Sequence, residues 1–201
     1  FLGLTVSGGH TQLVLVNSPS EMEVIGQTLD DAVGEAFDKA GKMIGLPYPA
    51  GPYIDKYAEN GEPNIPFSMP KAPGLDFSFS GFKTSVLYYL RKQHQLDKNY
   101  IQNHRNDLCS SVQHILVSIL MEKLEKAVIQ TGIKEIVIGG GVSANSGLRQ
   151  ALSKRTDWNV FIPPLSFTTD NAAMIAVAGY FKYQNKNFGV MDRQAQSRMS
   201  L

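Results

Sequence analysis

The chain has 201 residues, of which 43% are hydrophobic and 18% are charged, so it can bury the core of one large domain or two small ones. Its net charge of +1 excludes strong overall attraction to nucleic acid, although a local basic patch is compatible with it. The single cysteine, Cys109, excludes a disulfide framework and favours a reducing, cytoplasmic compartment. No apolar run approaches the ~18 residues of a membrane span and no signal peptide is evident, so we expect no membrane partner.

The start of the chain predicts two strands joined by a glycine turn. An apolar run over residues 1–6 leads into Ser7-Gly8-Gly9-His10-Thr11, and a second apolar run follows to residue 16. Gly-Gly between apolar runs is typical of a β-hairpin. Two adjacent glycines also let several backbone N–H groups converge on an anion such as phosphate. Both interpretations are open from this stretch alone. Because the chain opens inside a strand, we expect residues before Phe1 in the complete protein.

The next segments predict a third strand and a helix. Residues 21–28 (EMEVIGQT) form the strand, and short links between three strands favour an antiparallel meander. Apolar residues at helical spacing predict a helix over residues 31–44, with Asp30 or Asp31 as its N-cap and Gly45 at its end.

The middle of the chain is rich in proline and glycine. Residues 47–52 (PYPAGP) predict no regular element, and residues 54–59 predict a short helix. Residues 61–81 are expected to form a long ordered loop, a kind of segment that is often functional. Residues 82–92 predict a helix and residues 93–103 a polar surface connection. The loop should bury five apolar side chains, namely Phe67, Met69, Leu75, Phe77 and Phe79.

The last part of the chain alternates helices and strands. Residues 107–130 show the longest helical pattern, with Gly132 as C-cap and Cys109 as a buried bystander. A strand at residues 134–138 then enters the turn Gly139-Gly140-Gly141-Val142-Ser143-Ala144-Asn145. The remaining expected elements are a helix at 146–155, a strand at 158–162, a helix at 172–183 that Thr168-Thr169-Asp170-Asn171 caps, and a polar tail at 184–201.

This order of elements favours an α/β fold in which a β-meander and βα units form a mixed sheet with helices on its faces. The layout resembles one lobe of the superfamily of actin, hexokinase and the heat-shock chaperone ATPases. That superfamily holds phosphate at a glycine hairpin and adenosine at a later glycine-rich turn. Residues 7–11 and 139–145 stand in those two places, and a helix N-terminus after a glycine turn suits ribose or phosphate.

Longer motifs narrow the resemblance to one family. The chain is similar, from residue 1 to about 183, to the tRNA N6-adenosine threonylcarbamoyltransferases, once described as sialoglycoprotein endopeptidases. The motifs that carry the resemblance are VSGGHTQ (6–12), DDAVGEAFDKAGKMIGLPYPAGP (30–52), LDFSFSGFKT (75–84), GGGVSANSGLR (139–149) and TTDNAAMIA (168–176). By this resemblance residues 1–183 are the second, C-terminal lobe of a two-lobe enzyme, and residues 184–201 are a tail.

The resemblance implies a reaction and partners. The enzyme transfers the threonylcarbamoyl group of threonylcarbamoyl-AMP to N6 of adenine 37, in tRNAs that read codons starting with A. Family members hold one iron or zinc ion, whereas magnesium and ATP belong to companion steps. Bacterial members work with a paralogous dimerisation partner and a small ATPase.

The resemblance also implies a substrate site. The phosphate of the adenylate should meet the N–H groups of Ser7, Gly8 and Gly9, and the ribose hydroxyls should meet carboxylates. Asn145 should bind adenine or ribose, and it can cap the following helix as well. Without the resemblance, Asp38 reads as a solvated charge on an amphipathic helix. The implied substrate-binding set is Thr5, Val6, Ser7, Gly8, Gly9, Asp38, Gly51, Asp55 and Asn145.

Asp170 is the metal ligand that the resemblance places in this chain, with an N-cap as the alternative role. The family's other ligands lie on a His-x-x-x-His helix in an N-terminal lobe that precedes VSGGHTQ. The four histidines here, His10, His94, His104 and His114, include no pair four positions apart. We therefore expect an incomplete and inactive lobe. No catalytic residue is assigned, and the absence of a Ser-His-Asp or Cys-His pattern argues against an acyl-enzyme.

Basic residues could contribute to a tRNA surface, although singly they also read as solvated charges. The candidates are Lys71, Lys83, Lys123, Lys126, Lys134, Arg149, Lys154 and Arg155. Two other classes of function stay open. One is an ATP-dependent kinase of the same superfamily, which would release ADP. The other is a non-catalytic scaffold subunit.

Overall fold

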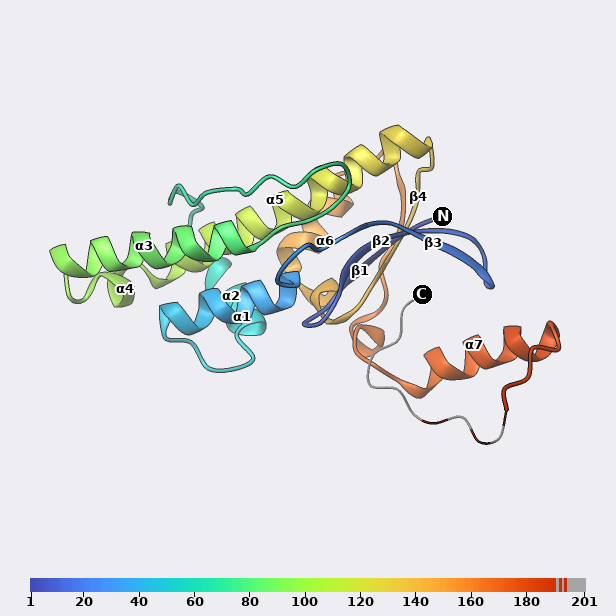
Figure 1. The fold of residues 1–201 in the computed structure, drawn as a ribbon. Helices are drawn as coiled ribbons and strands as arrows, with labels where there is room; N and C mark the ends of the chain where they lie inside the picture. The colour runs from blue at the N-terminus through green and yellow to red at the C-terminus, as the bar shows by residue number, and fades with distance from the viewer. Residues whose placement is uncertain (191, 193, 195–201) are drawn as a thin grey trace.

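Five strands form one mixed sheet in the order β3-β2-β1-β4-β5 (Figure 1). Strands β1 (Leu2–Val6), β2 (Thr11–Ser18) and β3 (Glu21–Gln27) pair antiparallel, and β4 (Glu135–Gly139) and β5 (Asn159–Phe161) extend the sheet with parallel pairings. The computed structural model describes residues 1–190, 192 and 194. It confirms the expected α/β class and the meander. The expected tail at 184–201 lies partly outside the described residues.

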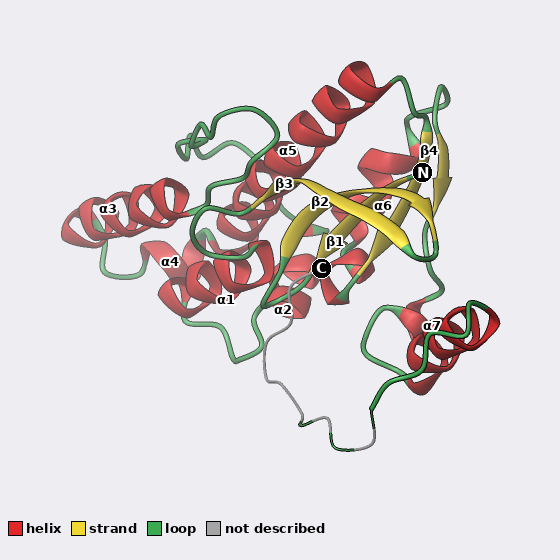
Figure 2. Ribbon diagram, turned by 45° about the vertical axis from the view of Figure 1, so that its right-hand side comes forward, coloured by secondary structure: helices red, strands yellow, loops and turns green. Residues whose placement is uncertain are grey.

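Seven α-helices are described besides this sheet (Figure 2). They are α1 (Val33–Ile44), α2 (Gly51–Ala58), α3 (Ser80–Leu96), α4 (Tyr100–Asn103), α5 (Arg105–Thr131), α6 (Ser146–Ser153) and α7 (Ala172–Gln184). Two short 3₁₀ turns, Gly141–Ala144 and Leu165–Phe167, precede α6 and α7. Gly45 and Gly132 end α1 and α5 in left-handed conformations, as the sequence predicts.

One continuous core joins the sheet to the helices. The alternating side chains of β1, Leu2, Leu4 and Val6, are fully buried in it together with apolar residues of α1, α3, α5 and α6. Alternation places these three side chains on one face of the sheet, so that face is the one the helices cover. Cys109 is buried on α5, and this burial raises the pKa of its thiol to about 12, which fits a bystander rather than a nucleophile.

The long loop between α2 and α3 is ordered by its own side chains. Phe67, Leu75, Phe77 and Phe79 are buried as predicted, whereas Met69 is exposed, contrary to the prediction. The buried Lys123 of α5 donates hydrogen bonds from Nζ to the carbonyl oxygens of Ala72 (2.7 Å) and Gly74 (2.9 Å) in this loop. These contacts fix the loop to the longest helix.

Three predictions of local structure are wrong. The proline-rich stretch 47–52 contains the start of α2, because proline is accepted in the first turn of a helix. The expected surface connection 93–103 is partly helical, since α3 continues to Leu96 and residues 100–103 form α4. Neither Asp30 nor Asp31 caps α1, whose N-cap position is Ala32.

Helix α7 differs from the other helices because every one of its residues is exposed, whereas the short α4, which also buries no residue, keeps Tyr100 and Ile101 half-buried. Helix α7 lies apart from the helices around the sheet in both views (Figures 1 and 2). Its apolar side chains stand in solvent, with Ile175 76% exposed. Apart from the masked residues, the structure shows no helix long and apolar enough to cross a membrane.

Candidate functional site

The glycine turn between β1 and β2 is closed by hydrogen bonds within itself. The Ser7 N–H donates to the carbonyl of His10 (2.8 Å), while Ser7 Oγ accepts from the N–H groups of His10 (2.9 Å) and Gly9 (3.2 Å). Two of the three amides predicted to meet phosphate are therefore engaged inside the turn. For the Gly8 amide, the described residues provide no acceptor, so Gly8 is the amide best placed for a ligand.

The turn is fixed against the start of α1. Thr11 Oγ1 accepts a hydrogen bond from the Val33 N–H (2.8 Å), and the Gly34 N–H donates to the Ser7 carbonyl (3.1 Å). A Cβ on Gly34 would lie 2.7 Å from that carbonyl oxygen, which is closer than real Cβ atoms come. Thr11 thus does for α1 what was expected of Asp30 or Asp31. The two segments are packed too closely for a side chain at residue 34.

A pocket of about 630 Å³ opens between this turn, α1 and the segment that leads into α2. Gly8 contributes one wall, Ala50 contributes another, and α1 presents a polar face whose residues recur every three or four positions. The full lining is Gly8, Glu35, Asp38, Lys39, Lys42, Leu46, Pro47, Tyr48 and Ala50. Two predicted substrate residues, Gly8 and Asp38, are therefore brought together in one cavity.

Asp38 is held in place by the backbone. Its Oδ1 accepts a hydrogen bond from the Ala50 N–H (2.7 Å), and Oδ2 has no hydrogen-bond partner among the described residues. Gly51 follows directly, and a Cβ placed on it would meet nothing within 4 Å. Packing therefore does not demand glycine at residue 51, and its backbone is open to close approach by a ligand.

Asp55 and Asn145 meet in a second polar cluster, which holds the start of α6. Both carboxylate oxygens of Asp55 accept from the Ser146 N–H (3.0 and 3.1 Å), and Oδ1 also accepts from Ser146 Oγ (2.7 Å). Asn145 caps α6 by accepting from the Leu148 N–H (2.9 Å), and its Nδ2 donates to Asp55 (3.1 Å) and Gln113 (2.8 Å). The N-cap role of Asn145 is confirmed. A ligand at either residue would have to replace one of these bonds.

The remaining predicted site residues lie elsewhere. Val6 is buried in β1, and Thr5 pairs with Gln12 and Gly139 inside the sheet. Asp170 is exposed just before α7, but Asn171 is the residue that caps this helix, since its side chain accepts from the Met174 N–H (3.3 Å).

The metal that the family implies needs more ligands than these residues give. Protein-bound iron or zinc takes at least three protein ligands, and Asp170 offers one carboxylate. Among the described residues no group of three His, Cys, Asp or Glu side chains could hold a metal ion. The donor set of this chain does not fit a complete site, and no chemical step is assigned to a metal here.

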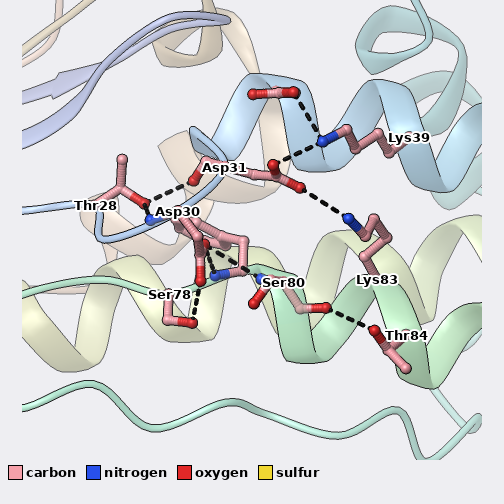
Figure 3. A network of polar contacts seen from close by, with 10 residues as sticks. Thr28, Asp30, Asp31, Lys39, Ser78, Ser80, Lys83 and Thr84 are labelled. Atoms are coloured by element: carbon pink, nitrogen blue, oxygen red, sulfur yellow. Dashed lines mark hydrogen bonds and ion pairs between the residues drawn. The ribbon is translucent and has the colours of Figure 1, made fainter.

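A polar network that the sequence did not predict joins the segment after strand β3 to the start of α3 (Figure 3). Asp30 accepts hydrogen bonds from Ser78 Oγ (2.6 Å) and from the N–H groups of Phe79 (2.7 Å) and Ser80 (3.3 Å). Partial burial acts to raise the pKa of Asp30, but these hydrogen bonds outweigh it and hold the pKa below its usual value. The adjacent acids Asp30 and Asp31 predict a helix cap, and Asp30 does hold a helix start, but that of α3 rather than that of α1.

The neighbouring Asp31 joins α1 to α3 through two lysines. Its Oδ1 lies 2.6 Å from Lys39 Nζ and its Oδ2 lies 3.7 Å from Lys83 Nζ. Lys39 also pairs with Glu35 (2.8 Å). The hydrogen bonds that Lys39 donates to Asp31 and Glu35 raise the pKa of Lys39, so the ammonium charge at the pocket wall is fully formed at neutral pH.

Several basic side chains predicted as candidates for a tRNA surface bind other groups of the protein instead. Lys123 is buried against the loop carbonyls and cannot reach RNA, so its assignment is wrong. Arg149 donates to the carbonyls of Ser143 (2.7 Å) and Pro163 (2.7 Å), and Arg155 pairs with Glu125 and Asp157.

The sheet, the glycine hairpin and the β4–α6 turn define one lobe of the actin-like ATPase fold. The activator of the 2-hydroxyisocaproyl-CoA dehydratase from Clostridium difficile with bound ADPNP shares this fold, at a TM-score of 0.51 and 13% identity, over 96% of this chain and 65% of that one. Residues 2–177 match the family tRNA N6-adenosine threonylcarbamoyltransferase. The chain belongs to this family, which confirms the resemblance drawn from the motifs.

Relatives with the same description are similar over almost the whole chain. The tRNA N6-adenosine threonylcarbamoyltransferase of Christiangramia forsetii is 54% identical over 98% of this chain and 59% of its own length. The protein of the same description from Cytophaga hutchinsonii is 51% identical over 100% of this chain and 60% of its own length. The chain thus spans about 60% of the length of these relatives.

Proposed function

We propose that this chain supplies the adenylate-binding lobe of an enzyme that modifies tRNA. The enzyme transfers the threonylcarbamoyl group of threonylcarbamoyl-AMP to N6 of adenine 37, in tRNAs that read codons starting with A. Membership of the family supports the class of reaction. The observation that carries the assignment within this chain is that Gly8 and Asp38 line the same cavity.

Each end of that cavity suits a part of the adenylate. The Gly8 amide is a donor for a phosphate oxygen, and its glycine neighbour leaves the approach unobstructed. Asp38 Oδ2 is an acceptor for a ribose hydroxyl, while Oδ1 is fixed by the Ala50 N–H. A carboxylate held in this way loses little side-chain freedom when a ligand binds, which favours affinity.

The reaction asks for positioning rather than for a covalent intermediate on the enzyme. The N6 amine of adenine attacks the carbamoyl carbon, the bond from that carbon to the phosphate oxygen breaks, and AMP leaves while the amine loses a proton. Holding the phosphate and ribose fixes the carbamoyl carbon for this attack, and such positioning can supply a large part of the rate. The catalytic groups around the reacting atoms are not assigned to this chain.

The companion components are proposals as well. As the family resemblance implies, the enzyme would work with a paralogous dimerisation partner and a small ATPase. One iron or zinc ion would bind at Asp170, with its other ligands from the N-terminal lobe of the complete enzyme. We place the reaction in the cytoplasm, where its tRNA substrate is found.

The test is transfer of labelled threonylcarbamoyl to tRNA by the complete enzyme with its companion proteins. Asp38→Asn keeps an oxygen for the Ala50 N–H but removes the charge, so we expect a loss of about 10- to 100-fold in kcat/KM for the adenylate, as for one hydrogen bond to a charged group. Glu23→Gln, an exposed acid on β3, is the matched control.

Unchanged kcat/KM in Asp38→Asn would remove Asp38 from the substrate site. Release of ADP from ATP by the complete enzyme without the small ATPase, together with no transfer in the full mixture, would favour the kinase alternative. The 201-residue chain alone is expected to give no transfer, and measurable transfer by it would show that the lobe is sufficient.

A further inference from the structure

The outer end of the pocket carries an aromatic ring that stands almost entirely in solvent. Tyr48 lines the cavity with Leu46 and Pro47, yet 85% of its surface is exposed. A tyrosine ring that is this exposed gains little from the protein's own core. Its position at the rim of the predicted substrate pocket makes it accessible to a large molecule that approaches the bound adenylate.

The two lysines on the pocket wall differ in how their charge is balanced. Lys39 lies within 2.8 Å of carboxylate oxygens of both Asp31 and Glu35. Lys42, one turn further along α1 and next to the rim, has no carboxylate within 4.0 Å among the described residues. The positive charge available to an incoming anion at this end of the pocket is therefore that of Lys42.

An exposed ring that lines the same pocket as an uncompensated cation is suited to single-stranded RNA. Bases that are not stacked in a helix stack on aromatic side chains, and the flanking phosphates pair with lysine. We propose that Tyr48 and Lys42 form a contact for one nucleotide of the acceptor RNA at the open end of this pocket. The inference rests on the proposed function, because that function assigns the inner end, at Gly8 and Asp38, to the adenylate donor.

The donor's own adenine is the other base that could stack on Tyr48, and the two sources are separable by experiment. Equilibrium binding is measured on the complete enzyme with two probes, a labelled anticodon stem-loop RNA and AMP. The variants are Tyr48→Ala, Tyr48→Phe and Lys42→Gln. Tyr88→Ala is the matched control, since Tyr88 is 64% exposed on α3 and does not line the pocket.

We expect Tyr48→Ala to weaken RNA binding about tenfold, as for loss of one stacked base, and Tyr48→Phe and Tyr88→Ala to leave it unchanged. Lys42→Gln should weaken RNA binding and reduce the slope of log Kd against log salt by about 0.7, the share of one phosphate of a single strand. AMP binding should change much less than RNA binding in Tyr48→Ala and Lys42→Gln, and not at all in Tyr88→Ala.

Two results would overturn the inference. One is RNA binding that is insensitive to Tyr48→Ala, and the other is a loss of AMP binding in Tyr48→Ala without a loss of RNA binding, which would assign the ring to the donor. The proposed function fails separately. An enzyme that binds RNA through Tyr48 but transfers no threonylcarbamoyl group would refute that function and leave the RNA contact standing.

Discussion

The hydroxyl oxygen of Thr11 accepts a hydrogen bond from the backbone N–H of Val33 at 2.8 Å, and both residues are fully buried. This single bond joins the end of the glycine turn to the first residue of α1, across 22 positions of sequence. The turn and α1 both line the proposed substrate pocket. Together with the bond from the Gly34 N–H to the Ser7 carbonyl, the Thr11 bond holds the turn that carries Gly8 against the helix that carries Asp38.

Thr11→Val is expected to destabilise the chain by about 1–3 kcal/mol. Valine has nearly the shape of threonine, so the main loss is the acceptor for a buried N–H group. Urea unfolding followed by circular dichroism measures the change. Thr11→Ser, which keeps the hydroxyl, should retain most of the stability, and equal midpoints for Thr11→Val and the unchanged chain would show that this bond contributes nothing.

Gly34→Ala tests the close contact between α1 and the turn. Alanine normally favours a helix over glycine by about 1 kcal/mol, so a substitution without a clash should not destabilise. At residue 34 the new Cβ would lie 2.7 Å from the Ser7 carbonyl oxygen and 2.8 Å from the Gly8 nitrogen. We expect a clear fall in the unfolding midpoint, together with weaker AMP binding because the turn is displaced.

Gly179→Ala is the matched control for Gly34→Ala. Gly179 also lies in a helix, α7, but a Cβ there would meet nothing within 4 Å. This variant should leave the unfolding midpoint the same or slightly higher. If both substitutions were neutral, the contact between the Ser7 carbonyl and α1 would be more adaptable than its geometry indicates.

The sequence predicted the elements that follow from local spacing of apolar residues. Helices α1 and α5, the meander and the final βα units all appear within a few residues of their expected limits. The prediction was wrong where the local structure depends on hydrogen bonds between residues far apart in the chain. Asp30 precedes α1 in the chain, but its carboxylate holds residues 48 to 50 positions away at the start of α3. No local pattern distinguishes an acid that caps the next helix from one that caps a distant helix.

The site shows the same division between local and long-range information. The motifs located Gly8 and Asp38, and the fold brings them to one pocket. They also located Asp55 and Asn145, but the structure joins Asp55 to Asn145 across 90 positions and to Ser146 across 91. The exposed Tyr48 lies inside the family motif, yet only the structure shows that its ring stands in solvent. Exposure depends on the packing of the whole chain, which residue spacing does not give.

The Asp30 network predicts a loss of stability in acid. The pKa of Asp30 is lower in the folded chain than its ordinary value of 3.8, so folding favours the ionised form. Its contribution is complete above the unfolded pKa and disappears as the pH falls through the folded pKa. Asp30→Asn keeps an acceptor oxygen but loses the charge, so it should be less stable than the unchanged chain at pH 7, by about 0.5–1 kcal/mol as charge-assisted hydrogen bonds become neutral ones.

Urea titrations of Asp30→Asn and of the unchanged chain across pH 7 to 2 test this expectation. The difference in the free energy of unfolding should shrink below the ordinary aspartate pKa, because the unchanged chain then loses the same charge. Glu21→Gln, an exposed acid on β3, is the control and should show no such convergence. A difference that stays constant with pH would mean that the charge of Asp30 has no part in holding α3.

Lys123→Met tests the anchor between α5 and the long loop. The Lys123 side chain is 4% exposed, and its ammonium is the donor to the carbonyls of Ala72 and Gly74. Methionine keeps most of the apolar stem but leaves both carbonyls without this donor, so we expect a loss of about 2–4 kcal/mol for two charge-assisted bonds. Lys126→Met is the matched control. It removes an exposed lysine three residues further along α5, which pairs with Glu122, and should cost less than about 1 kcal/mol. Hydrogen exchange of the loop amides should accelerate in Lys123→Met alone.

Equal stability of the two variants would show that the loop is held by its buried phenylalanines rather than by the lysine.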